Sequence, residues 1–144
     1  MITIPDKYSI EKRSNIMSKI RGKETKPEIL VRNYLFSKGF KYRLHDEKLP
    51  GKPDIVLPKY RTIIFIHGCF WHGHPGCKRS KLPATNAEFW EKKLSANIER
   101  DKRTIERLKK EGWNIIVLWQ CEISSKKKRE DRLERLIEEI NANR

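Results

Sequence analysis

A pair of apolar runs separated by a long helical pattern constrains the fold of this chain more than any other feature. Residues 62–67 and 113–119 are both strongly apolar, which is typical of buried strands, and we expect 113–119 to be fully buried. Between them, apolar residues recur at helical spacing from Thr85 until Gly112. This order predicts a crossover in which a helix joins two parallel strands.

Shorter patterns complete the predicted sheet and add two helices. Thr25 to Glu28 has the form of a capping box, which predicts a helix from Thr25 that Gly39 ends; residues 85–88 repeat that form. Residues 41–45 and 54–57 are predicted strands, and the turn at 58–61 makes 54–57 and 62–67 a hairpin. A last helix is expected at 126–141. The prediction is one α/β domain, with a mixed sheet and helices on both faces.

The charge balance indicates an anionic partner. The 144 residues include 33 Lys and Arg against 19 Asp and Glu, so the formal net charge is +14 with His neutral. Nucleic acid is favoured over an anionic membrane surface, because the basic residues run along the whole chain instead of one helix. Solubility is a third explanation, but it requires less charge. We find no apolar membrane span and no signal core, so we expect a soluble cytoplasmic protein.

Residues 1–24 are polar and basic, with too little apolar surface for a core. We expect them to form an arm that orders on its partner, and residues 25–144 to form the folded domain.

The segment 67–77 is the densest in chemistry, because it holds two cysteines and three histidines. Cys69, Cys77 and Cys121 with one histidine would make a closed tetrahedral set for a structural Zn²⁺. The alternative is three unbound cysteines beside surface histidines. Spacing leaves the fourth ligand open between His72 and His74, and the histidine that stays free can serve as a general base.

Two carboxylates have both a structural and a catalytic interpretation. Asp54 leads into a predicted strand beside another strand that ends in His67, an arrangement that can hold Mg²⁺ against a scissile phosphate. Its structural alternative is a Pro–Asp turn. For Glu28 the structural interpretation is the stronger one, because the third helical position of a capping box favours Glu.

Aromatic residues near this segment suggest contacts to bases. Phe70 and Trp71 are hard to bury in so polar a loop, and bulky rings of a basic protein can wedge between base pairs. Trp90 begins the long helix and is a further candidate. Trp113 and Trp119 lie on a predicted core strand, where packing is the simpler explanation.

Several motifs in order resemble the very-short-patch mismatch repair endonucleases over most of the chain: Pro50–Asp54, His67–His72, Pro83–Thr85, Glu88–Trp90 and Asn97–Asp101. The resemblance implies a restriction-endonuclease-like fold with a structural zinc site. It also implies a strand-specific nick beside the thymine of a T:G mispair, the product of 5-methylcytosine deamination. The substrate would be double-stranded DNA, with other repair proteins as further partners, and the asymmetric lesion suggests a monomer.

The resemblance also implies roles for individual residues. Asp54 and the backbone of Ile66 would hold the catalytic Mg²⁺, His72 would be the general base, and Glu28 and His67 would support the site. The structural Zn²⁺ would take Cys69, His74, Cys77 and Cys121. The residues at the DNA would be Met17, Phe70, Trp71, Trp90, Lys93 and Asn97, of which the three aromatic ones intercalate.

Two alternatives share these features. One is an endonuclease of the same fold that does not depend on a mispair. The other is a zinc-stabilised DNA-binding module without catalysis. Cleavage separates the binding module from both enzymes, whereas salt-dependent DNA binding is expected of all three.

Overall fold

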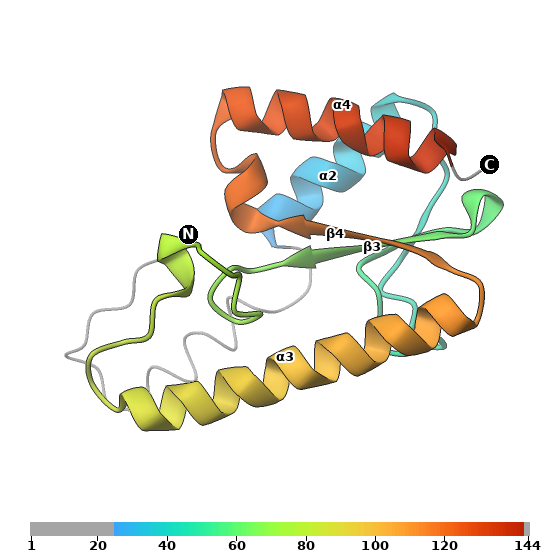
Figure 1. Cartoon of the computed structure of the whole chain (residues 1–144). Coiled ribbons are helices and arrows are strands. Elements are labelled where there is room, and N and C mark those ends of the chain that lie inside the picture. Colours follow the sequence, from blue (N-terminus) through green and yellow to red (C-terminus); the bar gives the residue numbers. More distant parts are fainter. Residues whose placement is uncertain (1–24, 143–144) are drawn as a thin grey trace.

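The computed structural model describes residues 25–142, and these form a four-stranded mixed sheet with helices on both faces (Figure 1). The strands are β1 (Arg43–Leu44), β2 (Ile55–Leu57), β3 (Thr62–His67) and β4 (Asn114–Trp119), in that order across the sheet. The β1–β2 and β2–β3 pairs are antiparallel, and β3–β4 is parallel. The predicted hairpin and crossover are therefore confirmed. The proposed arm and Met17 lie outside the described residues.

The helices form two layers around this sheet. Helices α2 (Lys26–Ser37) and α4 (Lys126–Ala142) cover one face, and the long helix α3 (Ala87–Lys110) crosses the other (Figure 1). Gly39 and Gly112 follow α2 and α3 with φ of 84° and 93°, as expected of glycines that end helices. None of the helices within residues 25–142 combines the length and the apolar character that a membrane crossing needs.

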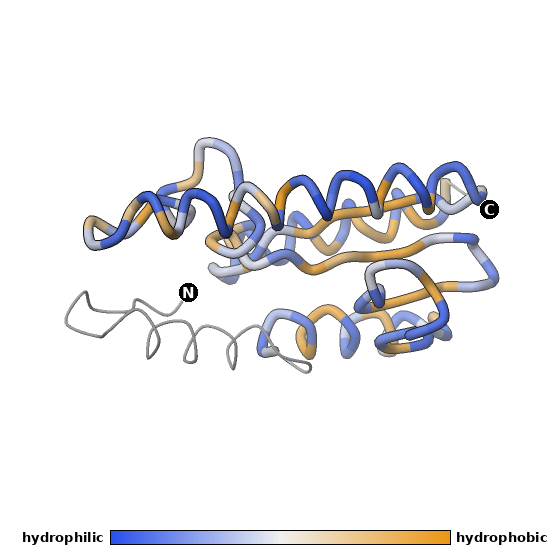
Figure 2. The backbone as a smooth tube through the Cα atoms, turned by 90° about the horizontal axis from the view of Figure 1, so that it is seen from below, coloured by the Kyte–Doolittle hydropathy of each residue, from blue (hydrophilic) through white to orange (hydrophobic). Residues whose placement is uncertain are grey.

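Successive side chains of the strands point to opposite faces of the sheet, so an apolar core forms on each face. Ile55, Leu57 and Ile64 pack with apolar residues of α2 and α4. Val56 and Ile63 face the other way and pack with residues of α3. Figure 2 shows the result along the backbone, because the strands are largely hydrophobic while the helices alternate between hydrophobic and hydrophilic residues.

The prediction that residues 113–119 are fully buried is wrong. Ile116 and Leu118 are buried, but the other residues of β4 are only partly covered. The reason is that, among the strands of the described part of the chain, β4 lies at the edge of the sheet and pairs with β3 alone. The apolar residues of β4 therefore lie on two partly covered faces of an edge strand, whereas the prediction required a central strand.

Neither predicted capping box forms. Thr25 is the N-cap of α2, but its side chain makes no capping hydrogen bond. Helix α3 begins at Ala87 with Asn86 as its N-cap, at φ 59°, so Thr85 lies outside the helix. Glu28 is buried in the protein, with Oε1 2.7 Å from His45 Nε2. Its position in the first turn of α2 thus serves a tertiary contact.

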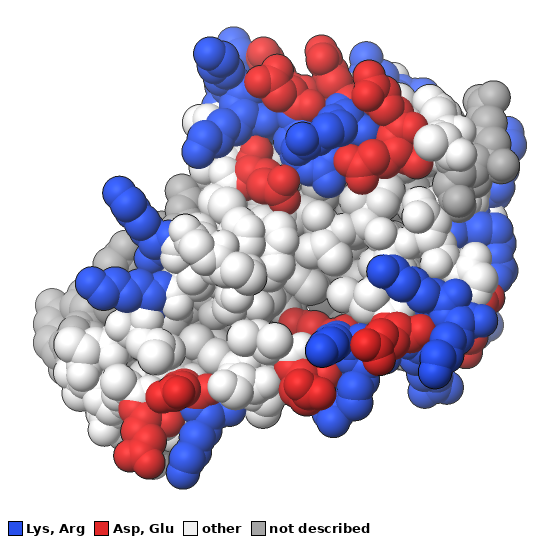
Figure 3. Space-filling model, in the orientation of Figure 1, with Lys and Arg blue, Asp and Glu red and all other residues white. Residues whose placement is uncertain are grey.

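Charge is mixed on the face shown in Figure 3. Lys, Arg, Asp and Glu gather over α4 and along α3, with a largely uncharged band between them over β4. Part of the charge on α4 is paired, since Arg132 contacts both Glu122 and Glu139. The net positive charge of the chain is therefore not concentrated on this face.

Candidate functional site

Within residues 25–142, three groups of metal-ligating or titratable side chains gather at one end of the sheet. They meet there because β2 and β3 are antiparallel, so the residue before β2 lies beside the end of β3. The backbone N–H of Ile66 donates to Asp54 Oδ2 at 2.8 Å, which fixes the carboxylate next to His67. The neighbourhood of Asp54 and His67 expected from the sequence is confirmed.

The first group consists of Glu28, His45 and Asp54, whose ligand atoms all lie within 4.8 Å of one another. Glu28 comes from the first turn of α2, and the His45 backbone N–H donates to the Asp54 carbonyl at 3.2 Å. Burial raises the pKa of Asp54 to about 6, against the hydrogen bond from Ile66, and the nearby charge of Glu28 adds to the rise. Carboxylates crowded in this way favour a bound cation.

The second group consists of His67, His72 and Asp101. The ring of His72 stacks on that of His67, with centroids 3.8 Å apart and planes 5° apart. Burial, with the charge of His72, lowers the pKa of His67 to about 3, so His67 is neutral at neutral pH. Its Nδ1 is buried, and no group within the described part of the chain hydrogen-bonds to it.

Asp101 pairs with His72, since Oδ2 lies 2.5 Å from Nδ1. Burial alone would raise the pKa of Asp101, but the hydrogen bond to His72 and the charge of that ring lower the pKa of Asp101 from its ordinary value. An ionised Asp101 accepts a hydrogen bond from Nδ1–H of His72 and fixes the ring orientation. The Nε2 atom of neutral His72 is then available to accept a proton from water.

We expect Asp101→Asn to lower the rate constant of DNA cleavage by about 10²–10³-fold, because an amide can stabilise the wrong tautomer of His72. Single-turnover cleavage at saturating enzyme measures this, and DNA affinity measured without cleavage should stay within about twofold. A variant that cleaves at the rate of the unmodified protein would show that His72 does not depend on this carboxylate.

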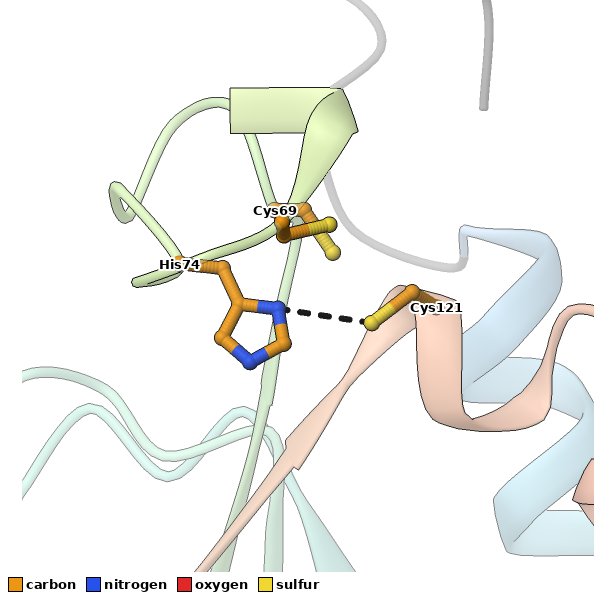
Figure 4. A group of neighbouring side chains, drawn as sticks. Cys69, His74 and Cys121 are labelled. Carbon is orange, nitrogen blue, oxygen red and sulfur yellow. Dashed lines mark hydrogen bonds between the residues drawn. The ribbon is translucent and has the colours of Figure 1, made fainter. Parts of the chain in front are cut away.

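The third group is Cys69, His74, Cys77 and Cys121, and its ligand atoms also lie within 4.8 Å of one another. Figure 4 shows His74 and Cys69 on the loop after β3 and Cys121 opposite them, at the end of β4. Cys121 Sγ lies 3.3 Å from His74 Nδ1. Three sulfurs and one imidazole nitrogen are a donor set that suits a closed tetrahedral Zn²⁺ site, so this cluster can hold a metal ion.

Burial makes the charged thiolate form of Cys69 and Cys121 unfavourable. Burial, with contacts to Cys121 and Cys77, raises the pKa of Cys69 to about 12. Burial also raises the pKa of Cys121. A cation that binds thiolates would offset this cost, and binding would release protons.

Trp119 lies between the second and third groups. Its ring stacks on His74, with centroids 4.1 Å apart, and meets His67 edge-on at 5.1 Å. The packing expected of this residue is therefore observed, but its neighbours are two site histidines.

The prediction that Phe70 and Trp71 are hard to bury in this loop is wrong. Phe70, Trp71 and Trp90 are 8%, 6% and 1% exposed, and they pack with Leu94 in a cluster of their own. Burial is possible because α3 extends alongside the loop and supplies Trp90 and Leu94 as a wall. Their insertion into DNA stays a prediction, and it requires this cluster to open.

Lys93 and Asn97 share one face of α3, as expected, and both contact Trp71. Lys93 Nζ lies 5.0 Å from the centre of the Trp71 ring. Asn97 is buried, and its amide donates to the Trp71 carbonyl at 3.2 Å. Their contacts to bases stay predictions, and both side chains touch Trp71 of the aromatic cluster.

The sequence reasoning missed His45 and Asp101. Asp101 ends one of the motifs quoted above and lies four residues after Asn97, a spacing that puts it on the same helix face. The only sequence signal at His45 was its position at the end of a predicted strand. Its proximity to Glu28 and Asp54 depends on the pairing of β1 with β2 and on the docking of α2.

Comparisons with known proteins agree with the motifs. The family described as DNA mismatch endonuclease Vsr matches residues 5–79. The chain is 50% identical over 135 residues to the type II nicking enzyme V.NmeAIP of Neisseria meningitidis, covering 94% of this chain and 96% of the relative. It is 42% identical over 119 residues to the DNA mismatch endonuclease Vsr of Escherichia coli K12, covering 83% and 76%. These matches, which agree with the motifs and with the side chains gathered at the end of the sheet, show that the chain belongs to the DNA mismatch endonuclease Vsr family.

Proposed function

We propose that this DNA mismatch endonuclease nicks one strand beside the thymine of a T:G mispair by Mg²⁺-dependent hydrolysis. Family membership makes the chain a phosphodiester hydrolase that acts on DNA, and the non-catalytic alternative is thereby set aside. The observation that carries the mechanism is that Ile66 holds Asp54 next to His67, whose ring stacks on the His72 of the His72–Asp101 pair. The relatives' name of nicking enzyme favours cleavage of a single strand.

The residues around Asp54 fit a catalytic cation. Asp54 and the backbone of Ile66 would hold it, with Glu28 close by. Crowded, buried carboxylates gain from such an ion. When bound, Mg²⁺ supplies positive charge to the developing charge on the phosphate.

The chain itself supplies the proton transfer. His72 Nε2 accepts the proton of the attacking water, while Asp101 holds the opposite side of the ring and stabilises its charged form. His67 is neutral and stacked on His72, so it limits the orientations of that ring without adding charge. The buried Nδ1 of His67 offers a hydrogen bond to a group that enters the site.

Zn²⁺ is the ion that we propose for the Cys₃His cluster, in a structural role. The ligands close a loop that carries His72 between Cys69 and His74. The four protein ligands leave no open position for a substrate.

The aromatic cluster of Phe70, Trp71 and Trp90 is the proposed reader of the mispair. A mispair is easier to unstack than a matched pair, so opening the cluster into DNA costs less there. Lys93 and Asn97 contact Trp71 and are suited to hydrogen-bond exposed base edges when Trp71 moves. Met17 on the N-terminal arm would add a further contact to the DNA. We also propose that the protein acts as a monomer, because the lesion is asymmetric.

We expect nicking of a duplex with a single T:G mispair, and none of its fully matched twin, in a labelled-strand assay with Mg²⁺. Flanking sequences are varied in parallel, and Asp54→Asn is the inactive control. A nick beside the thymine that the twin and the control both lack supports the proposal. Equal cleavage of both duplexes would instead favour an endonuclease of this fold with other specificity.

A further inference from the structure

We propose that His45 is a ligand of the catalytic cation, so that this site is a mixed nitrogen and oxygen site that favours divalent transition metals over Mg²⁺. The inference rests on the proposed function, because it concerns the cation held at Asp54. It adds an imidazole to the oxygen ligands already named, and it assigns a chemical class to the ion.

The placement of His45 supports ligation. Its side chain is 14% exposed and lies in the same group as Asp54 and Glu28, with one ligand atom of each residue within 4.8 Å of the others. The backbone hydrogen bond between His45 and Asp54 anchors the two residues side by side. The backbone of His45 is therefore held beside Asp54, and this fixes the point from which the imidazole reaches the site.

The contact between His45 and Glu28 has a length that suits two ligands of one ion. Nε2 and Oε1 are 2.7 Å apart. Neighbouring ligands at about 2.1 Å from an octahedral ion lie roughly 3 Å apart, so both atoms can turn toward a common ion with little movement. Asp54, the backbone of Ile66 and the imidazole of His45 would then hold the ion, with Glu28 beside them.

The donor chemistry determines which ion gains. Mg²⁺ prefers oxygen ligands and keeps several waters, so an imidazole adds little to its binding. Divalent first-row transition metals accept nitrogen as well as oxygen ligands. The nitrogen of His45 thus shifts the preference of the site without changing its net charge.

Mn²⁺ is the probe for this inference, because pulsed electron paramagnetic resonance detects nitrogen bound to it. The protein is first given one equivalent of Zn²⁺ to fill the Cys₃His cluster. We expect a ¹⁴N coupling at bound Mn²⁺, which changes to the ¹⁵N pattern when the histidines are ¹⁵N-labelled. Bound Mn²⁺ without nitrogen coupling would overturn the proposal, and this readout needs neither a variant nor DNA.

His45→Gln separates ligation from a structural role, because Gln can still donate a hydrogen bond to Glu28. We expect the variant to lose the nitrogen coupling and to bind Mn²⁺ about tenfold more weakly, while Mg²⁺ affinity changes less than threefold. His72→Gln is the matched control and should keep the coupling. Equal losses for both ions, or coupling that persists in His45→Gln, would contradict ligation by His45.

The nicking assay keeps the two proposals apart. Nicking at T:G mispairs without nitrogen coupling would reject only the role of His45. Nitrogen coupling that His45→Gln removes, in a protein that nicks no T:G duplex, would reject only the proposed specificity.

Discussion

Asp54→Asn is expected to reduce nicking by about 10³-fold or more and, at the same time, to make the protein more stable. The loss of activity follows because the amide cannot match the charge of the carboxylate toward the cation, and stabilisation of developing charge is usually the largest catalytic contribution. The gain in stability follows from the pKa of Asp54, which burial raises to about 6. Single-turnover nicking and urea unfolding measure the two effects.

The sign of the stability effect follows from proton linkage. The unfolded chain releases the Asp54 proton near pH 3.8 and the folded chain near pH 6, so the folded state binds more protons between these values. The stability that Asp54 contributes is full below pH 3.8 and is lost as pH rises through 6. At pH 8, without added divalent cations, the variant should therefore be more stable by about 1–3 kcal/mol.

Asp101→Asn is the matched control for this experiment. The pKa of Asp101 lies below its ordinary value, so its charge stabilises the folded state at pH 8 and its loss should destabilise. The Asn at position 54 can still accept the hydrogen bond from Ile66, which keeps the comparison to charge alone. A less stable Asp54→Asn protein at pH 8 would contradict the burial argument.

Cys121→Ser is expected to remove the metal ion from the Cys₃His cluster and to lower the free energy of unfolding by about 3 kcal/mol or more. Cys121 is the ligand that follows β4, whereas the other three ligands lie on the loop after β3. The ion therefore links two parts of the chain, and structural zinc sites contribute strongly to folding. Elemental analysis and urea unfolding of the purified proteins measure both effects.

Ser124→Ala is a suitable control, because Ser124 is exposed and its hydroxyl donates to the Cys121 carbonyl at 3.0 Å. It should retain one equivalent of zinc and lose little stability. Unmodified protein that is fully folded and free of metal would rule out a structural ion. Nicking by Cys121→Ser should also fall, because His72 lies on the loop that the ion holds.

The parts of this molecule that local patterns determine were predictable from the sequence. The bounds of β3 were right, because its apolar run lies between a turn and a polar loop. The start of α3 was predicted at Thr85, but the helix begins at Ala87. The preceding loop fixes this start, and the capping motif does not record the conformation of that loop. Burial of Phe70 and Trp71 depends on a wall from α3, and no pattern near these residues records that wall.

Some residues of the candidate site could also be predicted from local patterns, and others could not. Asp54 was identified because it lies at the start of one strand beside the end of another, an arrangement that hairpin topology alone implies. The roles suggested for the site residues came from motif resemblance and stay predictions. His45 was missed because its proximity to Glu28 joins two elements that are far apart in the chain.

The ring of Trp119 forms a common wall between the stacked pair His67 and His72 and the Cys₃His cluster. One face of that ring supports His74, while the ring also meets His67, which in turn stacks on His72. A change at this position alters the support of both regions at once. Variation there is therefore constrained jointly, and a smaller residue would need compensating changes on both sides to be retained in evolution.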